Sequence, residues 1–401
     1  VLAQGSAFGE CTSSSCQARW CTKYTNRVGV SLLDCAKGQW RGCNNLICFV
    51  ALTTPMSLLG RKLCQQWLPQ FLSLISVVQN VSRRDYCSLS LWFFKTKQNG
   101  MIYKKQAEAS GVILQISAIF GNCGGGLSVF TTLTDFTLME EKGQLFVNAP
   151  NAIEGNRKEV LNSASAVFQS KEAGTVDFVG NETEVFEEIR KLTQIFPSNY
   201  KDQSKVIDCV DDLNRLCENI SAGNGKEILI QIADQNEFLE LKKDYGNDMT
   251  IGFIRLDGET IGCIANKEER ISAQGAKKAA SFVKLCDAFG IGILTVTDTV
   301  GFVAEIEQEK ELSQAIGAMT GAFVQATVPK VNVISKKAFG SAYVSMNSKS
   351  IGADFVYAWS DAKIGMMEAD MAVKIMYPGA NADVLKEKAK EYEELQSDVY
   401  T

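Results

Sequence analysis

The stretch that decides the fold is VPKVNVISKKAFGSAYVSMNSKSIGADFVYAWSDAKIGMM, residues 328–367. It opens on the β-branched run Val331–Ile334, which predicts a buried strand. A turn of small residues, Gly340-Ser341-Ala342, comes next, followed by a helix-compatible segment and a second apolar strand, Phe355–Trp359. A strand that runs through such a turn into a helix leaves backbone N–H groups suited to negative charge. Ordinary α/β packing, with small residues where a helix approaches a sheet, explains the same pattern.

The pattern occurs a second time at residues 112–126, VILQISAIFGNCGGG, which align without gaps on residues 327–341. The alignment pairs Ile116 with Val331, Gly126 with Ser341 and, after a short insertion, Asp135-Phe136 with Asp354-Phe355. A strand–turn–helix unit that repeats over such a distance predicts a duplicated domain. Each copy would present its own cluster of backbone donors.

Composition excludes several classes of function. The chain has 401 residues, a formal net charge of −5 and no histidine. Without histidine it has no Ser–His–Asp or Cys–His nucleophile, no histidine base and no histidine-containing metal site. The mild acidity argues against a nucleic-acid partner, and no P-loop motif for ATP is present. The glycine-rich run 121–126 lacks the spacing of a dinucleotide site.

Residues 1–100 differ sharply from the rest of the chain. They hold eight of the thirteen cysteines and four of the five tryptophans, and only three acidic residues against eleven basic ones. None of these cysteines has C-x-x-C spacing, so a zinc ribbon is not expected and we predict no metal site. No helical or strand period persists. This composition favours an aberrant, out-of-frame segment, with a divergent domain and a Cys-rich insertion as alternatives.

From residue 101 onward the pattern is that of an α/β protein. We expect the remaining part of an N-terminal domain over 101–197, a polar linker over 198–227 and a C-terminal domain over 228–401. In the C-terminal domain, ILIQIAD and MTIGFIRLDGETIGCIAN, residues 228–234 and 249–266, are interpreted as a hairpin that turns at Asp257-Gly258.

Four further features of the C-terminal domain lead to expectations. Ser272 is expected to cap a helix. Asp298, at a strand end, fits either a turn cap or a catalytic acid or base. Lys336-Lys337 is expected to be a solvated pair, although it could attract an anionic ligand. Met366-Met367 is expected in the core.

Three motifs resemble a known family. They are DAFGIGILTVTDTVGF (287–302), KKAFGSAY (336–343) and NCGGG (122–126). Together they are similar to the carboxyltransferase subunit of biotin-dependent enzymes, which include propionyl-CoA carboxylase β, methylmalonyl-CoA decarboxylase α and transcarboxylase. The resemblance covers residues 101–401. It implies an α/β fold of two crotonase-type (ClpP/crotonase-like) ββα-spiral domains, of which the N-terminal one would be incomplete here.

The resemblance also implies an activity. Carboxybiotin on a separate carrier would exchange its carboxyl group with the α-carbon of an acyl-CoA through an enolate, and the resemblance favours methylmalonyl-CoA/propionyl-CoA as the thioester. The chain has no Met-Lys-Met biotin-attachment motif. The positions that match the family's CoA thioester site are Gly124, Gly125 and Gly126. Those that match its biotin site are Phe339, Gly340, Ser341 and Ala342. Gly125 with Gly126, and Ser341 with Ala342, would be the backbone oxyanion donors.

The implied partners are a biotin carrier and further copies of the chain, paired N-domain to C-domain in a dimer and assembled as a hexamer. A biotin carboxylase subunit or a membrane decarboxylase pump are further options, with a cytoplasmic location that could be peripheral to a membrane complex. The unreadable first part and an end at Thr401, short of the family's helical tail, suggest a truncated chain. The alternatives are a crotonase-type hydratase or hydrolase without biotin, and a non-catalytic fragment of a damaged gene.

Overall fold

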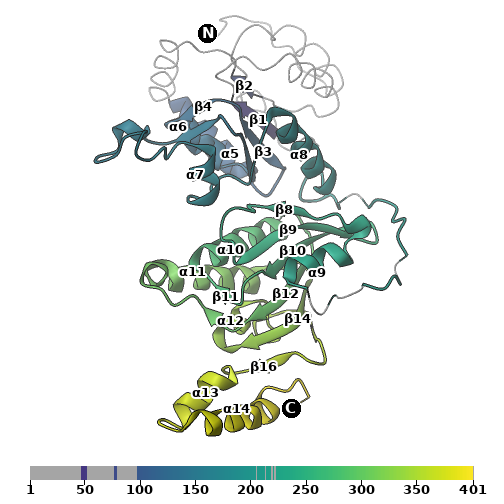
Figure 1. Cartoon of the computed structure of the whole chain (residues 1–401). Helices are drawn as coiled ribbons and strands as arrows, with labels where there is room; N and C mark the ends of the chain where they lie inside the picture. The colour runs from purple at the N-terminus through teal and green to yellow at the C-terminus, as the bar shows by residue number, and fades with distance from the viewer. Residues whose placement is uncertain are drawn as a thin grey trace, which may run out of the picture. The chain divides into compact units, whose positions relative to one another are not determined.

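The computed structural model describes residues 47–51, 76–78 and 97–400, apart from positions 205, 213, 218, 219, 221 and 222. Two compact units are present (Figure 1). The first unit ends at Asp202 and the second begins at Gln203. The interpretation of residues 1–100 lies outside the described residues, except for two short strands and the start of a helix. The predicted linker, 198–227, contains the boundary between the units and stays a prediction.

The first unit is built on a parallel sheet in the order β2-β1-β3-β5-β7. Its strands are β1 (Ile47–Ala51), β2 (Ser76–Val78), β3 (Gln115–Ile119), β5 (Phe136–Glu140) and β7 (Phe178–Gly180), with a separate parallel pair of β4 (Asn122–Gly124) and β6 (Gln144–Phe146). Its helices are α5 (Lys97–Ala109), α6 (Gly126–Thr132), α7 (Ala166–Lys171) and α8 (Glu182–Ile195), with a 3₁₀ turn, η2 (Pro150–Ala152). All five residues of β3 are buried, as a central strand requires.

The second unit has a mixed sheet in the order β15-β14-β12-β10-β9-β8, and β16 also pairs with β14. The strands are β8 (Leu239–Leu241), β9 (Met249–Leu256), β10 (Glu259–Asn266), β12 (Ile293–Thr299), β14 (Lys330–Phe339), β15 (Phe355–Ala358) and β16 (Lys363–Gly365), and β11 (Arg270–Ile271) pairs with β13 (Gly301–Phe302). The helices are α9 (Gly225–Ile232), α10 (Ala273–Ala288), α11 (Ile306–Gln325), α12 (Gly340–Ser345), α13 (Ala369–Met376) and α14 (Ala382–Gln396), with 3₁₀ turns η3 (Asp234–Asn236) and η4 (Lys349–Ile351).

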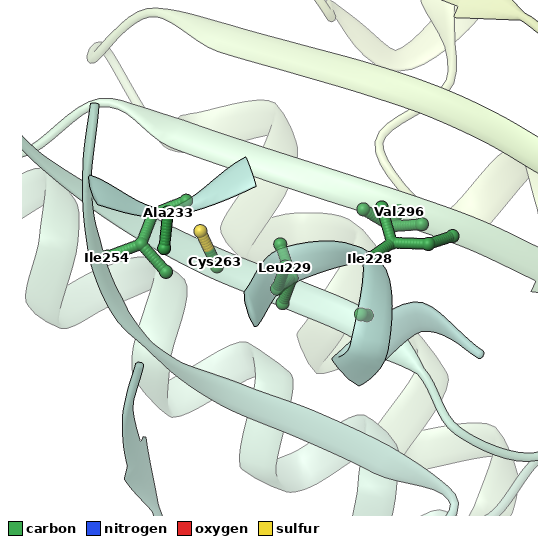
Figure 2. Close-up of a cluster of buried hydrophobic side chains, with 7 residues drawn as sticks. Ile228, Leu229, Ala233, Ile254, Cys263 and Val296 are labelled. Carbon is green, nitrogen blue, oxygen red and sulfur yellow. The ribbon is translucent and has the colours of Figure 1, made fainter. Parts of the chain in front are cut away.

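The interpretation of residues 228–234 as part of a hairpin is wrong. Residues 228–232 lie in α9, and the hairpin consists of β9 and β10 alone. The Asn224 side chain accepts from the Glu227 N–H, and the Glu227 side chain accepts from the Asn224 N–H, which starts a helix. Apolar residues of α9 then pack on Cys263 of β10 and its buried neighbours (Figure 2). A short apolar run fits both the helical and the strand period, and here the Asn224 capping box favours the helix.

The placement of Met366 in the core is also wrong. Its side chain is 85% exposed, and Met367 is half-buried. Met366 directly follows the three-residue strand β16, which pairs with the last three residues of β14. Met366 therefore lies beyond Gly365, the last residue of this strand that pairs with the sheet. The expected cap is confirmed, because the Ser272 Oγ accepts the Gly275 N–H at 2.9 Å.

The internal repeat is confirmed by strand register. Ile116 pairs with Phe136, as Val331 pairs with Phe355. Asp135 Oδ2 accepts the backbone N–H of Gln115 at 2.8 Å, and Asp354 Oδ2 accepts that of Lys330 at 2.7 Å. Gly124 likewise pairs with Phe146, as Phe339 pairs with Gly365. The residues of β3 and β4 align without gaps on their counterparts in the second unit, and the Asp135 turn aligns after the short insertion. The two units therefore share one strand–turn–helix frame.

Lys278 stabilises the second unit from inside. Its side chain is 2% exposed, and its Nζ donates to the carbonyl oxygens of Lys242, Tyr245 and Met249, each at 2.8 Å. Lys278→Met leaves three acceptors without this donor, so we expect the free energy of unfolding to fall by about 3 kcal/mol in urea denaturation.

The same side chain gives stability a pH dependence. Burial lowers the pKa of Lys278 from 10.5 to about 8. The folded chain therefore binds fewer protons than the unfolded chain between these values, and the free energy of unfolding should rise with pH across this window. Lys278→Met should lack that rise. The matched control is Lys277→Met, which removes only an exposed ion pair with Glu311 and should change stability by less than about 1 kcal/mol. Equal losses in both variants would contradict the assignment.

Candidate active site

Two glycines form the turns that join strand to helix in the two units. Gly125 has φ 63° and Gly340 has φ 59°, values that residues with a side chain rarely adopt. At Gly125 an added Cβ would meet nothing within 4 Å, so the requirement for glycine there is conformational. The two positions correspond in the gapless repeat. In each unit, therefore, the chain turns sharply out of a strand at this glycine. The short helix begins directly after Gly125 in the first unit and at Gly340 itself in the second.

In the first unit, two adjacent backbone N–H groups face no acceptor. The N–H of Gly125 donates to the Phe146 oxygen at 2.9 Å, and that of Ser128 donates to the Gly125 oxygen at 3.1 Å. Between them, the N–H groups of Gly126 and Leu127 have no hydrogen-bond acceptor among the described residues. These two groups are at the start of α6, where no carbonyl precedes them in the helix.

The carbonyl groups of the same turn are held by hydroxyl groups. Ser128 Oγ donates to the Gly125 oxygen at 2.7 Å. Tyr103, on α5, donates from its hydroxyl to the Gly126 oxygen at 2.8 Å. The turn is thus fixed by a strand contact on one side and by two hydroxyl groups on the other.

In the second unit, the corresponding N–H groups belong to Ser341 and Ala342. Neither has an acceptor within the part of the chain that the structure describes. Ser341 is exposed, whereas Ala342 and the preceding Phe339 are 1% and 4% exposed. The open pair Ser341–Ala342 aligns with Gly126–Leu127 in the repeat. The two units therefore present equivalent pairs of donors.

Charged groups surround the end of β14, shortly before this second turn. The Lys337 N–H donates to Asp298 Oδ1 at 3.2 Å, and the Lys337 Nζ lies 3.1 Å from carboxylate oxygens of both Glu269 and Glu368. Burial raises the pKa of Asp298. Burial alone would lower the pKa of Lys337, but its hydrogen bonds to Glu368 and Glu269 raise it. The expectation of a solvated lysine pair is wrong for Lys337, whose ammonium is held between two carboxylates.

The structure places the predicted site residues in two turns. Gly124 ends β4, and Gly125 and Gly126 form the turn into α6. Phe339 ends β14, and Gly340, Ser341 and Ala342 begin α12. Sequence reasoning missed three residues that contribute to the first turn: Leu127 and Ser128 of α6, and Tyr103 of α5. Leu127 could have been found by applying the gapless repeat to Ala342. Tyr103 carries no sequence signal, because its contact depends on how α5 packs.

Across the described residues, no group of three or more His, Cys, Asp or Glu side chains could hold a metal ion. Within the same residues, every helix is too short or too polar to cross a bilayer.

Comparison with known proteins agrees with the geometry. The family described as carboxyl transferase domain matches residues 89–401. The propionyl-CoA carboxylase beta chain of Cereibacter sphaeroides is 35% identical over 314 residues, which cover 73% of this chain and 62% of that protein. The methylmalonyl-CoA decarboxylase subunit alpha of Propionigenium modestum is 33% identical over 69% of this chain and 57% of that protein. The chain thus spans about three fifths of the length of these relatives.

A solved structure shows the fold. One chain of the transcarboxylase 12S structure, solved with methylmalonyl-coenzyme A and methylmalonic acid bound, superposes with a TM-score of 0.73 at 26% identity, and the match covers 84% of this chain and 69% of that one. The expected α/β, crotonase-type fold is confirmed by this match. With its matching family region and its duplicated strand–turn–helix frame, the chain belongs to the carboxyl transferase domain family.

Proposed function

We propose that the chain catalyses carboxyl transfer between an acyl-CoA and biotin, with the biotin borne by a separate carrier as the second substrate. The observation that carries this proposal is the pair of equivalent turns, each with two adjacent N–H groups free of acceptors among the described residues. A carboxyl transfer of this kind has two carbonyl oxygens that gain negative charge, one on the thioester and one on the ureido group. Two donor pairs match two oxygens.

The chemistry needs stabilisation of charge more than a side-chain base. The carboxyl group leaves the α-carbon, and the electron pair of the broken C–C bond passes to the thioester oxygen. The ureido nitrogen forms a bond to the carboxyl group and loses its proton, which passes to the α-carbon, so atoms and charge balance. Preorganised N–H donors at such an oxygen are worth roughly 2.7–4 kcal/mol each. A chain with no histidine can supply these groups from its backbone.

We assign the thioester oxygen to the N–H groups of Gly126 and Leu127. This modifies the pair expected from the sequence, Gly125 and Gly126, because the Gly125 N–H already donates to Phe146. Gly126 is common to both assignments. Gly125 then serves as the left-handed residue of the turn, and Gly124 ends the strand before it.

We assign the biotin ureido oxygen to the N–H groups of Ser341 and Ala342, with Phe339 and Gly340 forming the approach to the turn. Ser341 is exposed, so its peptide is accessible to a carrier-borne group. The thioester that we favour is methylmalonyl-CoA, or propionyl-CoA in the reverse direction. The names of the relatives, which act on these thioesters, support this choice.

We further propose that the two turns of one active site come from different copies of the chain. The turns lie in separate units of one chain, and each supplies donors for only one oxygen. Two-fold pairing of the first unit of one copy with the second unit of its mate would complete two sites per dimer. The hexamer assembly of transcarboxylase 12S supports a dimer or larger assembly here. A biotin carrier, alone or within a carboxylase or decarboxylase complex, is the other partner.

The experiment is to incubate the full chain with methylmalonyl-CoA labelled in its free carboxyl group, with and without biotin. We expect label on biotin and an equal amount of propionyl-CoA. A hydratase or hydrolase would instead turn over thioester without biotin. Thioester turnover that is the same in the absence of biotin, with no label on biotin, would contradict the proposal.

A further inference from the structure

The two donor N–H groups of the first unit belong to peptide groups whose carbonyls are also engaged. A peptide group is planar, so its N–H and C=O keep a fixed relation. The N–H of Gly126 shares a peptide with the carbonyl of Gly125, and the N–H of Leu127 shares one with the carbonyl of Gly126. Whatever holds these two carbonyls therefore also orients the two N–H groups.

Hydroxyl groups hold both carbonyls. Ser128 Oγ donates to the Gly125 oxygen at 2.7 Å, and the Tyr103 hydroxyl donates to the Gly126 oxygen at 2.8 Å. A donor at the carbonyl draws electron density toward the oxygen and makes the N–H of that peptide a stronger donor, since linked hydrogen bonds strengthen one another by roughly 10–30%. Both donor peptides of this turn are therefore fixed in orientation and polarised.

The equivalent turn of the second unit lacks this feature. Its donor peptides carry the carbonyls of Gly340 and Ser341, and in the described part of the chain no side-chain hydroxyl donates to either oxygen. The residue that aligns with Ser128 is Tyr343, whose hydroxyl lies on a much longer side chain. The backbones of the two turns match, so the difference lies in the side chains that support them.

Tyr103 is held so that its hydroxyl stays in place. Its ring packs beside the buried cluster of Ala109, Ile113 and Phe130, and the side chain of Leu127 packs there as well. Burial raises the pKa of Tyr103 from its ordinary value, which favours the protonated hydroxyl that donates. The contact links α5 to the turn at the start of α6.

We propose that Tyr103 and Ser128 are positioning residues that orient and polarise the Gly125–Gly126 and Gly126–Leu127 peptides, and that the first turn is thereby built for the more highly charged of the two oxygens. This inference rests on the proposed function, in which the enolate oxygen of the thioester lies at this turn. A full negative charge develops there in the transition state, so stronger donors have their largest effect on turnover.

The test uses Tyr103→Phe, which removes one oxygen atom and keeps the ring in its cluster. We expect kcat for carboxyl transfer to fall about fivefold, the effect of one neutral hydrogen bond, with KM for the acyl-CoA unchanged. The carbonyl stretch of bound propionyl-CoA, labelled with ¹³C at the thioester carbon, should move to higher frequency in difference infrared spectra. This spectrum is recorded without biotin and does not depend on turnover.

Two further variants complete the design. Ser128→Ala should raise the same carbonyl stretch, and Ser128→Thr, which keeps a hydroxyl, should restore it. Tyr200→Phe is the matched control, because Tyr200 lies in the same unit and is 49% exposed. In the Tyr200→Phe chain, the carbonyl stretch of bound propionyl-CoA and the kcat for carboxyl transfer should equal those of the unchanged chain.

Each outcome decides the matter. An unchanged carbonyl stretch in folded Tyr103→Phe overturns the inference, even if kcat and Tm both fall, because the role is then only structural. A raised KM with unchanged kcat also overturns it. If the unchanged chain binds propionyl-CoA with a lowered carbonyl stretch but does not transfer carboxyl groups to biotin, the proposed function fails while the effect of Tyr103 on the donors stands.

Discussion

A Gly126→Pro chain is expected to transfer carboxyl groups at least about a hundredfold more slowly than the unchanged chain. Proline has no backbone N–H, so the substitution removes one oxyanion donor, and loss of one such donor lowers kcat by roughly 10²–10³. Gly126 is the first residue of α6, a position that proline occupies readily. The preceding Gly125 has ψ −132°, far from the α region that proline disfavours. The measurement is kcat in the labelled-carboxyl assay.

The matched control is Gly126→Ala, which keeps the N–H in the same helical backbone. Its kcat should stay within a few-fold of that of the unchanged chain, and both variants should unfold at similar temperatures. If Gly126→Pro and Gly126→Ala are equally slow, the loss comes from the added side chain and the backbone donor is not needed. Near-normal turnover in Gly126→Pro would show that this turn only packs the helix against the sheet.

Mixing two inactive chains is expected to restore activity. Ser341→Pro removes a donor of the second unit, as Gly126→Pro does in the first. If each site joins the first unit of one copy to the second unit of another, half of the dimers in an equal mixture contain both chains. One of the two sites in such a dimer is free of both changes, so the mixture should regain about a quarter of full activity. Ala342 is a poorer choice because it is 1% exposed, and a larger side chain would disturb the core.

The controls are each variant alone and the double variant mixed with the unchanged chain. Exchange between copies is verified with two different affinity tags, by capture of one and detection of the other. Absence of any restoration in a preparation shown to contain mixed dimers would contradict a site shared between chains. Full activity of a preparation that remains monomeric on dilution would contradict it as well.

Much of the fold follows from residue pattern because the frame occurs twice. Two β-branched strands, each followed by small residues and then by an aspartate turn, align without gaps, and strand register confirms the alignment. The sequence was less informative where the apolar run is short. Residues 228–232 fit either period, and only the Asn224 capping box makes them helical. Met366 looks like a core residue because the sequence does not reveal that β16 ends one position earlier.

The candidate site could likewise be predicted only in part from the sequence. The glycine-rich turn and its counterpart at residues 339–342 could be located from the sequence, since positive φ and small residues leave a clear trace. The sequence could not show which N–H groups lack an acceptor, because the Gly125 N–H donates to Phe146 only through the pairing of β4 with β6. The role of Tyr103 depends on the packing of a helix that lies more than twenty residues away in sequence. Contacts between distant elements leave no local pattern.

Carboxyl transfer through the two turns is tested most directly by following label from methylmalonyl-CoA to biotin, with the unchanged chain and the double variant Gly126→Pro/Ser341→Pro side by side. We predict that the unchanged chain labels biotin and releases propionyl-CoA in equal amounts, only when biotin is present. The folded double variant should do neither above background. Biotin-independent turnover by the unchanged chain, or equal labelling of biotin by the double variant, would contradict the assignment of the two turns as the catalytic groups.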